Sequence, residues 1–314
     1  MRRLSAGVLF AAAGFLVLTD SAAIGQTYVL WNFSSSGDHF GHSVAAAGDV
    51  DGDGVPDWIV GAPHANVAGG TIRKGNAKVF SGATGGILFV FWGNLQGGRF
   101  GEAVAGGGDA NADGVPDLAV GEPQGLAWPG TLTVFSGTNG APIHVLPGID
   151  ASGTFGASCA FLEDIDGDGG ADVIVGAPLA DTVQGNDGEV YVFSGMTGSL
   201  IHNFGGTALD QMFGLSVADA GDVDGDGTHD VVVGSRWSLL PPVPSQARVF
   251  SGANGSPLWT FTAGYQSFVY VAGAVPAAPS LVGGLVRFQG YVVDPGPLPL
   301  PGAMTPRLDL RIVP

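Results

Sequence analysis

One segment occurs four times in this chain of 314 residues, and that repetition limits the folds open to it. Each copy opens with Phe-Gly, at Phe40, Phe100, Phe155 and Phe213, so successive copies begin 60, 55 and 58 residues apart. A Val-Phe-Ser-Gly motif follows in the same phase in every copy. A repeat of this kind predicts stacked copies of one supersecondary unit rather than unrelated domains.

Within each copy the hydrophobic pattern has a period of two residues, as at Trp58-Ile59-Val60, and no stretch keeps helical spacing for ten residues. We expect four short strands per copy. The first runs from Phe-Gly to a Gly-Asp pair, the second ends in Gly-Ala-Pro, and the third carries Val-Phe-Ser-Gly. The fourth follows a glycine-containing turn, as at residues 87–91 and 200–204. The sequence therefore predicts an all-β fold, a β-propeller of four-stranded blades, over residues 26–262.

The two ends of the chain leave the closure of the ring open. Residues 28–33 precede the first Phe-Gly as a fourth strand does elsewhere, and residues 263–314 contain short apolar segments without an acidic loop. One interpretation is a degenerate fifth blade that the N-terminal strand completes. The other is a small C-terminal β tail, because prolines interrupt residues 295–301.

The first 25 residues are typical of a signal peptide. Arg2 and Arg3 precede an apolar run over residues 8–18, which is too short to span a bilayer, and small residues follow it. An N-terminal membrane anchor is the alternative. The signal predicts a secreted or cell-surface protein, with the periplasm as a further possible location, and no membrane span after cleavage.

Charge and cysteine content exclude several kinds of partner and site. The chain has 28 acidic and 11 basic residues, a net charge of −17, which argues against nucleic acid as a partner. Cys159 is the only cysteine, so this chain can form neither a disulfide framework nor a thiolate zinc site, and we expect Cys159 to be a small buried apolar residue. A cationic partner, above all a metal ion, remains.

An acidic loop lies between the first and second expected strands of each copy. Oxygen-bearing side chains occupy positions 1, 3, 5 and 9, a glycine occupies position 6, and position 7 offers its carbonyl, a donor set that suits Ca²⁺. The predicted ligand residues are Asp49, Asp51, Asp53, Val55 and Asp57 in the first loop; Asp109, Asn111, Asp113, Val115 and Asp117 in the second; Asp164, Asp166, Asp168, Gly170 and Asp172 in the third; and Asp222, Asp224, Asp226, Thr228 and Asp230 in the fourth.

These loops contain 15 of the 28 acidic residues, so most of the acidity is explained by about four Ca²⁺ sites, one per repeat. A simple Asx-rich turn is the alternative for a single loop. Position 12 is valine in all four copies, where an EF-hand would have its bidentate Glu, so the loops are not EF-hands. Asn111 replaces an aspartate, and we therefore expect the second loop to bind most weakly.

The combination of Phe-Gly, the acidic loop and Gly-Ala-Pro resembles the FG-GAP repeats of the integrin alpha-chain N-terminal β-propeller and of related secreted bacterial proteins. The resemblance covers roughly residues 28–262 and implies a propeller with calcium in the first hairpin of a blade and a role in cell adhesion or recognition. Two features depart from it. The fourth copy ends in Gly234-Ser235-Arg236, and four copies fall short of the seven blades of an integrin head.

The face opposite the acidic loops is the expected partner surface, because its loops differ most among the copies and carry aromatic and cationic residues. The candidate partner-binding residues are His64, Arg73, Lys74, Trp128, Arg236 and Trp237. The expected partner is an extracellular protein or glycan. No catalytic motif occurs, and His144 and His202 appear in equivalent fourth strands as a repeated surface position, so we predict a non-enzymatic recognition module. The alternatives are a polysaccharide-binding or carbohydrate-active exported protein and a structural surface protein without a discrete ligand.

Overall fold

The computed structural model describes most of the four repeats. The described residues are 37–66, 73–124, 129–150, 153–181, 185–209, 211–236, 238–239, 242–262, 285–286 and 310–311. The predicted signal peptide, the N-terminal strand at residues 28–33 and nearly all of residues 263–314 lie outside them. Within the described part of the chain no helix is long and apolar enough to cross a membrane.

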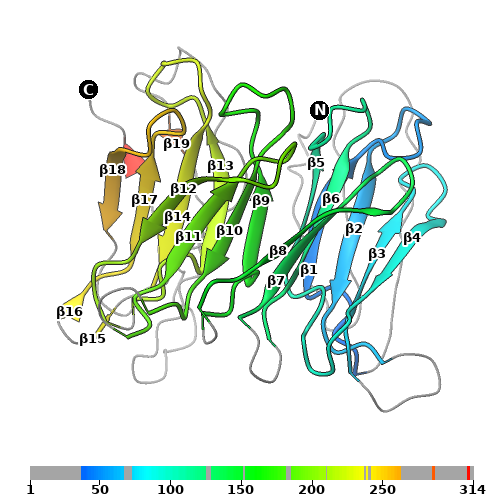
Figure 1. Cartoon of the computed structure of the whole chain (residues 1–314), viewed down its shortest axis with the longest axis horizontal. Helices are drawn as coiled ribbons and strands as arrows, with labels where there is room; N and C mark the ends of the chain where they lie inside the picture. Colours follow the sequence, from blue (N-terminus) through cyan, green and yellow to red (C-terminus); the bar gives the residue numbers. More distant parts are fainter. Residues whose placement is uncertain are drawn as a thin grey trace, which may run out of the picture.

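Four antiparallel sheets of four strands each follow one another along the chain, as the repeats predict (Figure 1). The first blade comprises β1 (Ser43–Gly48), β2 (Asp57–Ala62), β3 (Asn76–Phe80) and β4 (Ile87–Trp92). The second comprises β5 (Val104–Gly108), β6 (Asp117–Glu122), β7 (Thr131–Phe135) and β8 (Pro142–Pro147). The third comprises β9 (Ser158–Phe161), β10 (Val173–Ala177), β11 (Glu189–Phe193) and β12 (Leu200–Gly205). The fourth comprises β13 (Ser216–Gly221), β14 (Asp230–Ser235), β17 (Gln246–Phe250) and β18 (Pro257–Thr262).

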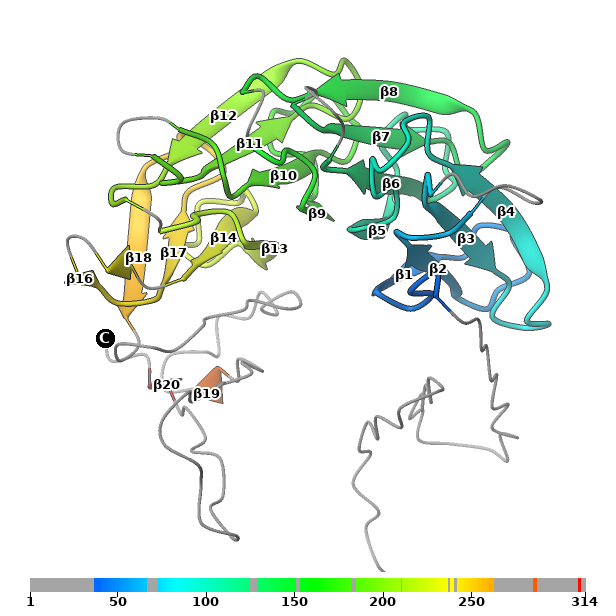
Figure 2. The ribbon, with the colours of Figure 1, turned by 90° about the horizontal axis from the view of Figure 1, so that it is seen from below.

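The blades are arranged along an arc, with the first strand of each blade on the inner side and the fourth strand on the outer side (Figure 2). This is the arrangement of propeller blades. Two short ladders lie outside the blades. They pair β15 (Ser238–Leu239) with β16 (Pro242–Val243), and β19 (Leu285–Val286) with β20 (Leu310–Arg311). The second ladder shows β pairing near the C-terminus, and the question of a fifth blade or a tail lies outside the described residues.

Three of the four hydrophobic clusters in the described residues lie between neighbouring blades, and the remaining one lies within the fourth blade. Ile59 and Phe91 of the first blade pack against Phe100 and Leu118 of the second, and the ring centroids of Phe91 and Phe135 are 4.1 Å apart. Full burial of a side chain of this size stabilises a fold by about 1.5 to 3 kcal/mol. Since each of the three clusters needs two blades, one repeat cannot be stable by itself.

The Phe-Gly and Gly-Ala-Pro motifs meet at the joint between two blades. A Cβ on Gly121, in the second blade, would lie 2.0 Å from the carbonyl oxygen of Gly156 in the third. Gly156 itself has a φ of 90° and donates its N–H to the carbonyl of Gly176 at 3.1 Å. Both glycines are therefore required because two backbones approach closely, one of them in a left-handed conformation.

The first blade differs from the others at its leading face, where no earlier blade is described. Val44 is 48% exposed, whereas Val104 and Val217, at the same position in the second and fourth blades, are 8% and 7% exposed. Cys159 occupies this position in the third blade. It packs against the core between the second and third blades, and burial raises the pKa of its thiol to about 12. Cys159 is only partly buried, so the expectation of a small apolar residue packed against the core is met and that of full burial is not.

Candidate metal centres

The four acidic loops connect the first and second strands of their blades and share one set of hydrogen bonds. The aspartate at position 9 is fully buried in each loop. One of its oxygens accepts the N–H of position 2, at 2.7 to 2.8 Å, and the other accepts the N–H of the glycine in the Val-Phe-Ser-Gly motif, at 2.9 to 3.2 Å. These aspartates are Asp57, Asp117, Asp172 and Asp230.

The exposed part of each loop is fixed by its own carboxylates. The N–H of the glycine at position 6 donates to the aspartate at position 1, at 2.8 to 3.0 Å. The N–H of position 7 donates to the aspartate at position 5, at 2.8 to 3.0 Å. The position 7 residues are Val55, Val115, Gly170 and Thr228. Because the backbone holds these side chains, the carboxylates face one another before any cation arrives.

Three of the loops bring three carboxylates close enough to share one ion. In each group the ligand atoms lie within 4.8 Å of one another. The groups are Asp49, Asp51 and Asp53; Asp164, Asp166 and Asp172; and Asp222, Asp224 and Asp230. Among the described residues the second loop forms no such group of carboxylates. In this loop Asn111 donates a hydrogen bond from its side-chain amide to Asp113 at 3.1 Å. Asp57, Asp168 and Asp226 are in their predicted loops and outside these groups.

Electrostatics at these loops favour a bound cation. Burial raises the pKa of Asp172 to about 7 and that of Asp117 to about 6, and it also raises the pKa of Asp230. Asp166 and Asp168 add to the shift at Asp172 through charge repulsion. Asp49 Oδ1 is buried, and no described residue donates a hydrogen bond to it. Crowded carboxylates and an orphaned buried oxygen fit a hard divalent cation that accepts oxygen ligands.

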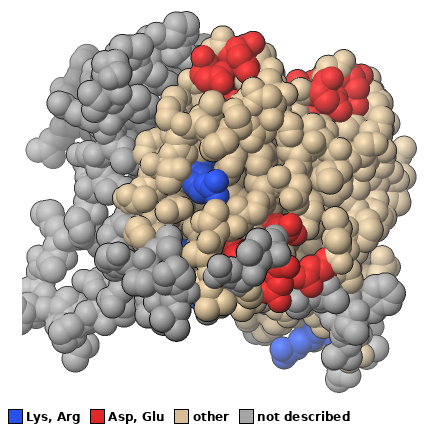
Figure 3. All heavy atoms as spheres, turned by 60° about the vertical axis from the view of Figure 1, so that its left-hand side comes forward, with Lys and Arg blue, Asp and Glu red and all other residues tan. Residues whose placement is uncertain are grey.

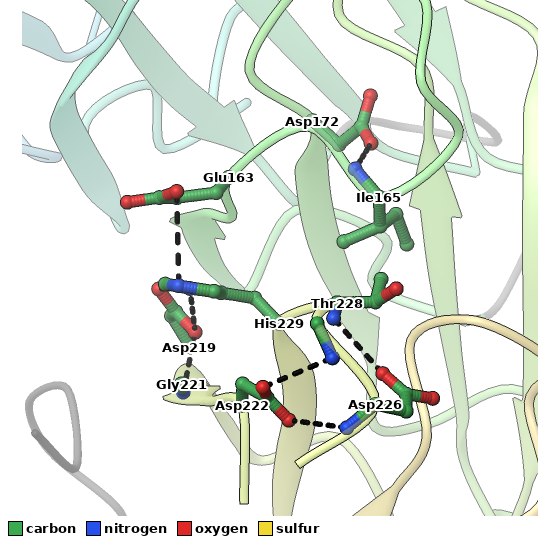
Figure 4. Close-up of polar contacts among 10 residues, drawn as sticks. Glu163, Ile165, Asp172, Asp219, Gly221, Asp222, Asp226, Thr228 and His229 are labelled. Carbon is green, nitrogen blue, oxygen red and sulfur yellow. Dashed lines mark hydrogen bonds and ion pairs between the residues drawn. The ribbon is translucent and has the colours of Figure 1, made fainter. Parts of the chain in front are cut away.

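The third and fourth loops are linked by His229, as Figure 4 shows. Its Nδ1 lies 2.9 Å from Asp219 Oδ2, and its Nε2 lies 3.7 Å from Glu163 Oε2, which directly precedes the third loop. Burial lowers the pKa of His229, but Asp219 and Glu163 together outweigh that effect and raise it. Neighbouring loops are thus in direct contact, which the sequence did not indicate. Figure 3 shows that acidic side chains on its face of the molecule gather in separate clusters.

On the opposite face, the structure brings part of the predicted partner surface together and adds to it. The rings of His64 and His39 have centroids 4.3 Å apart. Burial lowers the pKa of His64, and the nearby charges of His39, Arg99 and Arg73 lower it further. Burial raises the pKa of Glu122, and the nearby charge of Lys74 offsets part of that rise.

Of the other predicted partner residues, Arg236 is in the fourth blade, where its N–H donates to the carbonyl of Gln211 at 3.0 Å. Trp128 and Trp237 lie outside the described residues. His39 and Arg99 were not predicted as part of this surface, although both directly precede a Phe-Gly pair. That shared position is the signal that could have identified them.

Comparison with known families agrees with this geometry. A model of the FG-GAP repeat matches residues 40–76, 100–135 and 155–193. The chain is an FG-GAP repeat protein. The copy that begins at Phe213 lies outside the matched residues, although its sheet has the same strand sequence and the same loop hydrogen bonds. This FG-GAP protein therefore carries a fourth blade whose motif has diverged at Gly234-Ser235-Arg236.

Its relatives include integrin alpha chains. Integrin alpha-5 of Xenopus laevis is 31% identical over 216 residues, which cover 63% of this chain and 20% of that protein. Integrin alpha-4 of the same species is 32% identical over 230 residues, 68% of this chain and 21% of that protein. The crystal structure of Sqt1 from Saccharomyces cerevisiae covers 79% of this chain and 56% of its own, with a TM-score of 0.51 and 12% identity, and supports the fold alone. The FG-GAP protein spans about a fifth of the length of these integrin relatives.

Proposed function

We propose that this FG-GAP protein is an exported, calcium-stabilised propeller that acts as a non-enzymatic adhesion or recognition module. The observation that carries the proposal is the recurrence of three-carboxylate groups in hairpin loops with the same backbone hydrogen bonds. Residues at positions 1, 3, 5, 7 and 9 of each loop would hold one Ca²⁺. When bound, the ion supplies positive charge that offsets the repulsion among carboxylates.

In this proposal the metal has a structural role. The loops close the first hairpin of each blade, and their position 9 aspartates also hold the Val-Phe-Ser-Gly turn. A ligand that binds only the folded chain at 100 times its dissociation constant adds about 2.7 kcal/mol of stability per site. Several such sites would contribute an amount comparable with the whole stability of a typical domain.

The partner surface would lie on the face away from the metal loops. His39, His64, Arg73 and Arg99 place positive or protonatable groups together on a chain whose net charge is −17, and Glu102, which pairs with Arg99 at 2.5 Å, offsets one of these charges. This local excess favours an extracellular partner that presents carboxylate groups. Export rests on the predicted signal peptide at residues 1–25, and N-terminal sequencing of the mature protein tests it directly.

Binding to a carboxylate-rich peptide surface tests the recognition role. We expect the double variant Arg73→Ala, Arg99→Ala to lose binding. The rise in melting temperature that calcium causes should stay unchanged, because these residues lie on the face opposite the acidic loops. Val145→Thr, an exposed change on the outer strand of the second blade, serves as the control. Undiminished binding by the double variant would contradict this surface, and turnover of a substrate by the wild-type chain would contradict the non-enzymatic role.

A further inference from the structure

Two histidines on outer strands reach across to the next blade. His144 in β8 and His202 in β12 occupy the same register, opposite Val134 and Val192. His144 Nε2 lies 2.8 Å from the carbonyl oxygen of Gly195, and His202 Nε2 lies 2.6 Å from that of Gly252. Because a carbonyl oxygen only accepts hydrogen bonds, Nε2 must carry the proton in both cases. His144 and His202, which we expected at a repeated surface position, therefore make contacts between blades.

The glycines that these histidines contact also hold the buried aspartates of the metal loops. Gly195 donates its N–H to Asp172 Oδ1 at 3.2 Å, and Gly252 donates to Asp230 Oδ1 at 3.1 Å. A Cβ on Gly195 would lie 1.9 Å from the carbonyl oxygen of Ala171, so this residue has almost no room to move toward the loop. Each glycine is thus fixed on one side by the histidine and on the other by the position 9 aspartate.

The ligand group differs between the first loop and the two loops that receive a histidine. In the third and fourth loops, which receive a histidine from the preceding blade, the position 9 aspartate joins positions 1 and 3 in the three-carboxylate group. In the first loop the group is formed by positions 1, 3 and 5 instead. For the second loop the preceding blade offers Phe89, which lies against Gly140 and has no hydrogen-bond donor in its side chain. This loop is not part of the comparison, because Asn111 removes the carboxylate at position 3.

We propose that His144 and His202 are positioning residues for the cation sites of the third and fourth loops. All four loops form the glycine-to-aspartate hydrogen bond, so the histidine does not create it. By holding the carbonyl of Gly195 or Gly252, each histidine limits how far this turn can move against the loop, so that Asp172 or Asp230 stays within the ligand group. Neither histidine touches the ion. This inference rests on the proposed calcium binding and extends it, because the preceding blade then helps to set the affinity of the following blade's site.

Calcium titration calorimetry of the full chain and its variants tests the proposal. His144→Phe and His202→Phe place the residue of the first blade, Phe89, at the equivalent positions, so the blade-to-blade packing has a precedent in this chain. We expect one site to bind about tenfold more weakly in each single variant and two sites in the double variant, a factor that corresponds to the loss of about one net hydrogen bond. His144→Gln retains an N–H donor and should recover most of the affinity, and Val145→Thr should bind like the wild type.

Melting in EDTA separates a positioning role from blade packing alone. The proposal is supported if calcium affinity falls in the Phe variants and recovers in the Gln variant, whether or not the melting temperature in EDTA changes. It is overturned if the Phe variants bind calcium as tightly as the wild type, including the case in which their melting temperatures fall equally with calcium and with EDTA. A wild-type chain that binds no calcium would instead refute the proposed function.

Discussion

Replacing Gly195 with alanine tests how closely the Val-Phe-Ser-Gly turn is packed against the acidic loop. An added Cβ would lie 1.9 Å from the carbonyl oxygen of Ala171 and 2.9 Å from the Cβ of Ala110, which belongs to the second loop. Neither neighbour is the end of a flexible side chain, so the backbone itself must shift. Overpacking of this kind costs about 1 to 3 kcal/mol.

The same shift would draw the N–H of Gly195 away from Asp172, whose side chain is fully buried. An unsatisfied buried acceptor costs about 1 to 3 kcal/mol more. We therefore expect Gly195→Ala to lower the free energy of unfolding by about 2 to 6 kcal/mol. Urea denaturation in EDTA, followed by far-ultraviolet circular dichroism, measures this difference without a contribution from bound metal.

Gly86→Ala is the matched control. Gly86 is exposed in the corresponding turn of the first blade, its φ is not positive, and the nearest atom to an added Cβ is the side-chain oxygen of Thr84 at 3.2 Å. The second blade has Ala141 in the equivalent place. We expect the control to change stability by about 1 kcal/mol at most. Equal effects of the two substitutions would refute the packing argument.

Four further substitutions test the blade contacts and the loops. Burial raises the pKa of Glu122, which accepts the N–H of Leu95, so its ionised form destabilises the fold at neutral pH. As pH falls from 7 toward the ordinary glutamate pKa of about 4.3, urea denaturation should show wild-type stability rising relative to Glu122→Gln. A constant difference across that range would contradict the assignment. Val104→Ala should cost about 1.5 kcal/mol because Val104 is 8% exposed, whereas Val44→Ala at 48% exposure should cost less than about 0.5 kcal/mol; equal losses in thermal melts would argue against a blade joint there. Asn111→Asp should strengthen the weakest site in calcium titration calorimetry, and an unchanged affinity would show that the missing carboxylate does not set it.

The strands and loops could be predicted from the sequence because each depends on local patterns. Period-two alternation indicated the strands, and the spacing of aspartates indicated hairpin loops with a turn at the glycine of position 6. All four blades have the predicted strand order. The ladder of β15 and β16 was not predicted, because Pro242 in its second strand argues against a strand.

The contacts between blades could not be read from the sequence, because they join residues far apart along the chain. His144 and Gly195 are separated by 51 residues, and the repeat pattern alone suggested a surface position for the histidine. The close approach of Gly121 to Gly156 explains why both motifs contain glycine, but no local rule reveals that they face each other. Likewise, only the three-dimensional structure shows that the ring of His39 lies against that of His64 and so belongs to the cationic surface.

Calcium binding by the hairpin loops is the central claim, and thermal unfolding of residues 26–314 with a calorimetric ion count tests it most directly. Excess calcium should raise the melting temperature well above its value in EDTA, with three tight sites for the three carboxylate groups and a weaker fourth at the second loop. An unchanged melting temperature, or fewer than two ions per chain, would mean that the loops are solvated acidic turns and would contradict the account.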